Sequence, residues 1–150
     1  VGPEVRIRID ANQAWSPKQA VRLLNQMQDK GLDIELVEQP VKAHDYEGLK
    51  YVTERSYVPV LADEAVFSVE DALKIVQMQA ADLINIKLMK CGGITNALKI
   101  ATLAEVCGVE CMIGCMLVEG GAVFNEKEIT VSDAPGLGVT GIQGIRYLDD

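Results

Sequence analysis

The sequence predicts an α/β fold made of successive βα units that feed a parallel sheet. Short runs rich in β-branched residues alternate along the chain with longer segments of helical period. With 150 residues, 49% of them hydrophobic, the chain can fill a sizeable core. Five such strands with four intervening helices fit either a small open sheet or part of a (β/α)8 barrel, and composition alone does not decide between them.

Each expected element is bounded by residues that begin or end regular structure. The strands are expected over residues 5–9, 34–37, 58–61, 83–86 and 110–113. Ser16 and Pro17 supply a helix cap and a proline at the first helical position, and Gly31 ends that helix. The other three helices are expected to be capped by Asp45, Ser68 and Thr95.

The βα pattern stops after residue 117. Beyond it, the sequence predicts a hairpin formed by residues 121–124 and 128–131, followed by a turn-rich loop at 133–138. We therefore expect two parts, a partial barrel or sheet over residues 1–117 and a hairpin with its loop over residues 118–150.

Charge and hydropathy exclude several classes of partner. The 22 acidic and 14 basic side chains give a formal net charge of −8, which is unfavourable for binding nucleic acid. No uninterrupted apolar stretch approaches the roughly 18 residues of a membrane span, so a cytoplasmic protein with reduced cysteines is expected. The chain begins without methionine and in the middle of the pattern, so we expect a fragment.

Four ionisable residues occupy equivalent positions in successive βα units. Asp10, Glu38, Asp63 and Lys87 follow or end the first four strands, at spacings of 28, 25 and 24 residues. In a parallel barrel these positions converge on the C-terminal face, where active sites lie. This convergence favours the barrel. A complete barrel takes roughly 250 residues, so the chain would hold about half of one and expose two edge strands.

The four side chains together predict a metal site with an adjacent base. Three converging carboxylates repel one another unless a cation holds them, and oxygen ligands suit Mg2+. The charged form of Lys87 is disfavoured near a divalent ion in a partly dry site, so this lysine is a candidate general base. The expected substrate is a small carboxylate whose α-proton is removed to give an ene-diolate.

Other polar residues carry simpler interpretations. Any one of the three carboxylates alone would ordinarily be a loop or capping residue, and only their common register favours a site. Lys90 is expected to be solvated, and His44 to lie in a loop. Cys115 is expected to be a core thiol that could touch the site from the end of its strand.

Local motifs around these residues resemble the enolase superfamily. They are Asp-Ala-Asn at 10–12, Glu-Gln-Pro at 38–40, Asp-Glu at 63–64, and the run 85–94 from Asn-Ile-Lys to Gly-Gly-Ile. They look like barrel strands three to six of its muconate-lactonizing subgroup, most closely the dipeptide epimerases such as Ala-Glu epimerases. Residues 112–117 resemble the seventh strand.

This resemblance implies roles for individual residues. Asp10, Glu38 and Asp63 match the Mg2+ ligands and Lys87 matches the sixth-strand acid/base. Asn12 and Glu64 match positions that support the ligands, and Cys115 is kept with them as a supporting or substrate-binding candidate. The implied substrate is a dipeptide or amino-acid derivative, and family members are often homo-oligomers.

The chain also departs from the family pattern. A capping domain and two earlier strands, the second carrying the partner lysine, have no counterpart in it. After residue 117 the family continues with a helix and an eighth strand bearing Asp-x-Asp, whereas Val118 here begins the later hairpin at once. Either this segment is deleted, or it exists in the protein and is missing from these 150 residues. We favour the second explanation because a natural deletion would remove a core strand.

The sequence thus predicts the barrel portion of a Mg2+-dependent isomerase, an amino-acid or dipeptide epimerase. Muconate cycloisomerase and o-succinylbenzoate synthase are alternatives, because they resemble the same pattern and use the same type of intermediate. A third alternative, of a different class, is a non-catalytic half barrel that associates through its exposed strand edges.

Overall fold

The computed structural model describes residues 5–114, 118–120, 123–125, 128–130 and 139–142. The chain divides into two compact units, Val1–Ile113 and Gly114–Asp150. The expectation that a domain boundary follows residue 117 stays a prediction.

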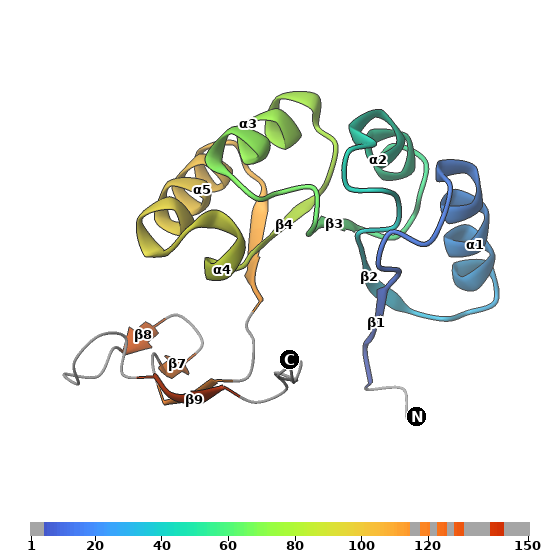
Figure 1. Cartoon of the computed structure of the whole chain (residues 1–150). Coiled ribbons are helices and arrows are strands. Elements are labelled where there is room, and N and C mark those ends of the chain that lie inside the picture. The colour runs from blue at the N-terminus through green and yellow to red at the C-terminus, as the bar shows by residue number, and fades with distance from the viewer. Residues whose placement is uncertain (1–4, 115–117, 121–122, 126–127, 131–138, 143–150) are drawn as a thin grey trace, which may run out of the picture. The chain divides into compact units, whose positions relative to one another are not determined.

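The first unit is built on a parallel sheet of five strands in sequential order (Figure 1). The strands are β1 (Ile7–Asp10), β2 (Ile34–Glu38), β3 (Val60–Ala62), β4 (Leu83–Ile86) and β5 (Glu110–Ile113). All five expected strands are present, and every neighbouring pair is parallel. Strands that follow one another in sequence and in space, each joined to the next through a helix, are the arrangement of a (β/α) barrel segment.

Helices cover one side of this sheet (Figure 1). They are α1 (Pro17–Asp29), α2 (Tyr46–Thr53), α3 (Val69–Met78), α4 (Leu88–Cys91) and α5 (Ile94–Val106). The strand residues that face the helices and the buried residues of the helices form one apolar cluster. Fully buried members of this core include Leu24, Leu49, Val60, Ile75 and Ile84.

The opposite side of the sheet carries the polar strand residues. Because side chains alternate along a strand, Leu36 and Glu38 share a face that Val37 does not. Aligned residues on neighbouring parallel strands point to the same side, and Asn85 is aligned with Met112. The apolar core therefore lies under the helices, and the predicted site residues lie on the other face, at the ends of the strands.

Two expected helix caps form as the sequence indicates. The Asp45 carboxylate accepts a hydrogen bond from the Gly48 amide at 2.8 Å, and the Ser68 hydroxyl accepts one from the Asp71 amide at 3.1 Å. At the start of α1, the Ser16 amide and hydroxyl both donate to the Gln19 side chain. These contacts fix the beginnings of the helices that follow β1, β2 and β3.

The expectation that Thr95 caps the last helix is wrong. The short helix α4 follows β4 directly and ends at Gly92, which has a φ of +80°. Gly93 then takes a φ of +107° and is itself the cap of α5, which begins at Ile94. Two consecutive glycines can adopt these left-handed conformations without steric cost. Thr95 therefore lies inside the helix.

The described residues of the second unit form four short strands. β7 (Val123–Asn125) and β8 (Glu128–Thr130) pair antiparallel and form the expected hairpin, with slightly shorter strands than predicted. β6 (Val118–Gly120) pairs antiparallel with β9 (Val139–Ile142), a pairing that the sequence did not predict. The expected loop at 133–138 lies outside the described residues. Among the helices that the structure describes, none is long and apolar enough to cross a membrane.

Candidate active site

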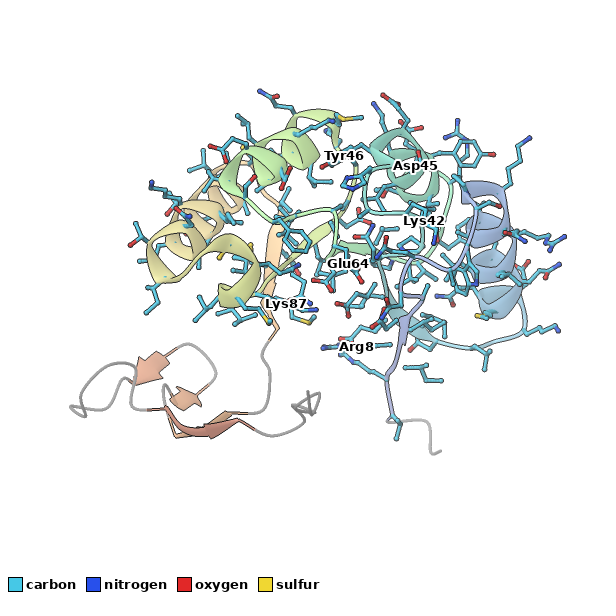
Figure 2. The ribbon with its side chains drawn as sticks, in the orientation of Figure 1. Arg8, Lys42, Asp45, Tyr46, Glu64 and Lys87 are labelled. Atoms are coloured by element: carbon cyan, nitrogen blue, oxygen red, sulfur yellow. The ribbon has the colours of Figure 1, made fainter. Side chains whose placement is uncertain are left out.

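Lys87 stands at the centre of the candidate site. It follows β4, and its ammonium lies 2.5 Å from Oδ2 of Asp63 and 3.9 Å from Oε1 of Glu38. Figure 2 shows Lys87 and Glu64 in the same region, where the ends of β3 and β4 meet. Three of the four residues predicted from the strand spacing therefore meet within ion-pair distance.

Asp63 is the most enclosed carboxylate of the site. Its side chain is 6% exposed, and its two oxygens bind different ammonium groups, Lys87 on Oδ2 and Lys90 on Oδ1. Burial disfavours the ionised form, but the hydrogen bonds from Lys87 and Lys90 outweigh it and lower the pKa of Asp63. Asp63 is therefore held as a carboxylate by two cations.

Glu38 lies beside Asp10 and is held by an amide. The two acidic residues are aligned on neighbouring strands, which lie about 4.8 Å apart in a sheet. The Asn85 amide donates to Oε1 of Glu38 at 2.8 Å. Burial raises the pKa of Glu38, and the charges of Asp63 and Asp10 raise it further. Together, burial and the two neighbouring carboxylates outweigh the Asn85 hydrogen bond and the Lys87 charge, both of which lower the pKa of Glu38.

The carboxylates beside Lys87 favour its charged form. Burial lowers the pKa of this lysine, but its hydrogen bond and ion pair with Asp63 outweigh burial, and the pKa is raised. In this arrangement the ammonium form is stabilised by its contacts with the carboxylates of Asp63 and Glu38. Lys87 acts as a cation here, in the position where the sequence predicts a divalent ion.

The expectation that Lys90 is solvated is wrong. Instead of being solvated, its side chain is only 8% exposed, and it contacts Oδ1 of Asp63 and the Asp63 carbonyl, the latter at 2.6 Å. Burial lowers its pKa. Lys90 lies within α4, and Lys87 is the extended residue that precedes this helix. The helix itself, only four residues long, gave no periodic pattern.

Gln39 is a further residue that the sequence did not single out. It is fully buried, with a φ of +35°, directly after Glu38. Its side-chain oxygen accepts hydrogen bonds from the amides of Asp63 at 2.9 Å and Ala65 at 3.1 Å, while its amide donates to Val41 O at 3.0 Å. Gln39 therefore fixes the backbone on both sides of Glu64. A left-handed residue at a strand end is a common feature of functional sites.

The supporting candidates lie in different surroundings. Asn12, with a φ of +46°, donates its backbone amide to Oδ1 of Asp10 at 2.9 Å, so its main chain supports that carboxylate. Among the residues that the structure describes, no hydrogen-bond partner is found for two buried oxygens, Oε2 of Glu64 and Oδ1 of Asn85. Cys115 lies outside the described residues.

The donor set fits a hard cation in its chemistry. Within the described residues, no three His, Cys, Asp or Glu side chains are arranged closely enough to bind one ion as they stand. The three predicted ligands are nevertheless all carboxylates, and the Lys87 ammonium occupies a cation position between two of them. Glu64 Oε2, for which the described part of the chain holds no hydrogen-bond partner, is a further oxygen that could bind a cation.

A separate cavity of about 520 Å³ lies elsewhere in the first unit. It is lined by residues from β1, β2, β4 and β5, among them Arg8, Leu36, Leu83 and Met112. None of Asp10, Glu38, Asp63 and Lys87 lines it. The site is therefore defined by converging charged groups at the strand ends rather than by this cavity.

The fold and this arrangement of strand-end charges define a class of (β/α)-barrel domain. A family model described as enolase C-terminal domain-like matches residues 1–124. The chain belongs to this family, within the enolase superfamily. The five parallel strands are accordingly part of the family's barrel, and not a small open sheet.

Several curated proteins are closely similar to the chain. The L-Ala-D/L-Glu epimerase of Clostridium acetobutylicum is 49% identical over 95% of this chain and 49% of that protein. The hydrophobic dipeptide epimerase of Enterococcus faecalis is 55% identical over 79% of this chain and 33% of that protein. The chain thus spans half the length of these relatives or less. The first alignment extends over 176 residues, more than the 150 of this chain, so at least 26 aligned positions have no counterpart here.

Solved structures of related enzymes are also similar to this chain. A substrate-liganded complex of the L-Ala-D/L-Glu epimerase from Bacillus subtilis superposes with a TM-score of 0.81 and 41% identity, covering 95% of this chain and 49% of that one. A dipeptide epimerase from E. faecalis V583, complexed with Mg and the dipeptide L-Leu-L-Tyr, gives 0.74 and 55% identity, covering 77% and 32%. A muconate cycloisomerase variant gives 0.70 and 33%, covering 75% and 31%.

Proposed function

We propose that this chain is the barrel portion of a Mg2+-dependent isomerase that epimerises a dipeptide or amino-acid derivative through its α-proton. The observation that carries the proposal is the contact of Lys87 with Asp63 and Glu38 at the ends of three adjacent parallel strands. The relatives named epimerases support the reaction class. The muconate cycloisomerase alternative is less favoured, because its identity to this chain is lower.

Asp10, Glu38 and Asp63 would hold the cation. Bound Mg2+ supplies positive charge that stabilises the negative charge developing on the substrate carboxylate during proton removal. The pKa of Glu38 is raised by burial and further by the charges of Asp63 and Asp10, and a cation at these residues would relieve that repulsion. The Asn85 amide keeps Glu38 oriented, and the Asn12 backbone amide keeps Asp10 oriented.

Lys87 would exchange the α-proton on one face of the substrate. Its ε-amine must lose a proton to act as a base, and its ion pair with Asp63 opposes that loss. When Asp63 is engaged elsewhere, burial still lowers the pKa of Lys87, and the charges of Glu38 and Glu64 are left to oppose it. The base for the opposite face is the partner lysine of the family pattern, which this chain does not contain.

The α-proton itself provides the test. Exchange is followed by proton NMR in deuterated water with L-Ala-L-Glu and L-Ala-D-Glu, the substrate class named for the relatives. Lys87→Ala should abolish exchange from one of the two isomers without weakening Mg2+ binding. Lys99→Ala, on an exposed position of α5, is the matched control. Retention of both exchanges in Lys87→Ala would rule out the assigned role.

The intact mass separates the enzyme from a non-catalytic half barrel. A protein weighing close to 16.3 kDa, the mass of these 150 residues, would not catalyse epimerisation by itself because it lacks the second base. A mass more than twice as large would show that the protein carries the remaining segments. Homo-oligomer formation and a cytoplasmic location remain part of the proposal.

A further inference from the structure

The two oxygens of Asp63 are bound by two lysines in different environments. Lys87 contacts Oδ2, and its side chain is 31% exposed. Lys90 contacts Oδ1, and its side chain is 8% exposed. One oxygen is thus reached from the open side of the site, whereas the other is held from within the protein.

Lys90 is anchored by more than this ion pair. Its ammonium also donates to the main-chain carbonyls of Asp63 at 2.6 Å and Asn85 at 3.4 Å. The Phe67 ring lies over the same ammonium, with its centroid 5.5 Å away. A cation bound to both the side chain and the backbone of Asp63 restricts how that carboxylate can rotate. The contact with the Asn85 carbonyl also links the Lys90 ammonium to the end of β4.

We propose that Lys90 is a positioning residue that holds Asp63 through Oδ1 and so presents Oδ2 to the bound cation. The inference rests on the proposed function, because it takes Asp63 to be a metal ligand. Groups that orient metal ligands typically change metal affinity by about 10- to 100-fold when they are removed. Lys90 acts through Asp63 and does not itself touch substrate or metal.

A simple charge effect makes the opposite prediction. An ammonium near a metal site repels the ion, so removal of a positive charge alone would strengthen metal binding. Lys87 supplies the matched comparison, because it carries the same charge and binds the other oxygen of the same carboxylate. Lys87 also competes directly for Oδ2. When Lys90 is removed, a positioning role predicts weaker metal binding, whereas a pure charge effect predicts tighter binding. When Lys87 is removed, neither explanation predicts weaker metal binding.

The experiment measures the affinity of the full chain for Mn2+ alone, by electron paramagnetic resonance of the free ion. Lys90→Met should bind Mn2+ at least tenfold more weakly than the wild type, and Lys87→Met should bind it no more weakly. Equal or tighter binding by Lys90→Met would overturn the positioning role. If the wild type shows no saturable Mn2+ binding, the proposed metal site itself fails, and the inference fails with it.

Folding is checked separately by circular dichroism and thermal melting. If Lys90→Met does not fold, Lys90→Gln decides the question, because its amide can reach one acceptor but cannot supply the charge and three donors. Lys90→Gln should fold and bind Mn2+ several-fold more weakly than the wild type. Unchanged affinity in this folded variant would contradict the inference.

Discussion

Replacing Gln39 by leucine tests how the loop that carries Asp63 is held. Leucine has a similar size but removes the oxygen that accepts from the amides of Asp63 and Ala65, and the donor to Val41 O. Each buried group left without a partner costs about 1–3 kcal/mol. Burial of the added apolar surface returns up to about 2 kcal/mol. We expect a net loss of about 3 kcal/mol, a large part of the total of about 5–15 kcal/mol.

Urea denaturation of the chain measures this loss. With a slope of about 2 kcal/mol per molar urea, the midpoint of Gln39→Leu should fall by about 1.5 M. Gln26→Leu, on an exposed position of α1, is the control and should stay within about 0.5 kcal/mol of the wild type. A midpoint for Gln39→Leu within the range of this control would refute the reasoning, because the three hydrogen bonds would then contribute nothing.

Gln39→Glu distinguishes the hydrogen bonds from side-chain size. A carboxylate at this buried position would place an oxygen against Val41 O, whereas the protonated form restores the donor. The folded-state pKa of the new carboxyl should therefore lie above its unfolded value of about 4.3. Because the folded state then binds the proton more tightly, the variant should gain stability relative to wild type as pH falls towards about 4.3. A difference from wild type that does not change with pH would contradict this account.

Two further predictions concern stability outside the site. A Cβ at Gly48 would overlap the Asp45 carboxylate that caps α2, so Gly48→Ala should cost about 1 kcal/mol in urea denaturation. In an Asp45→Ala background the same change should be neutral or stabilising, since alanine favours helix; an equal cost in both backgrounds would exclude the shared contact. Hydrogen bonds from Arg8 and Arg6 lower the pKa of Glu35. The stability that these ion pairs give the folded chain is therefore fully present above the unfolded-state pKa of about 4.3, and it is lost as pH falls through the lower folded-state pKa. Glu35→Gln should therefore melt below wild type at neutral pH, and the two melting curves should converge in acid and in high salt; a constant gap would contradict the ion pair.

Periodicity and spacing were sufficient to predict the fold. β-branched runs identified all five parallel strands, and the register of Asp10, Glu38, Asp63 and Lys87 favoured a barrel segment. These predictions succeed because strand and helix patterns depend on local alternation and because equivalent βα units repeat the same geometry. The family match and the solved relatives then confirm the barrel.

The missed features depend on contacts between distant parts of the chain. Lys90 is drawn inward by Asp63, which is 27 residues away, and nothing in its own neighbourhood distinguishes it from a solvated lysine. Gln39 is satisfied by backbone amides 24 and 26 residues away. The raised pKa of Lys87 likewise follows from a contact with Asp63 and not from its local sequence. Burial and pairing of this kind become visible only once the strand ends are assembled.

The central claim is that the strand-end carboxylates bind Mg2+, and calorimetric titration of Glu38→Gln tests it most directly. The substitution keeps the size of the side chain and its oxygen towards Asn85, but removes the negative charge. We predict saturable one-to-one Mg2+ binding by the wild-type chain and binding at least tenfold weaker in Glu38→Gln, equivalent to about 1.4 kcal/mol. Mg2+ affinity that is the same in both proteins would contradict the ligand role and with it the proposed chemistry.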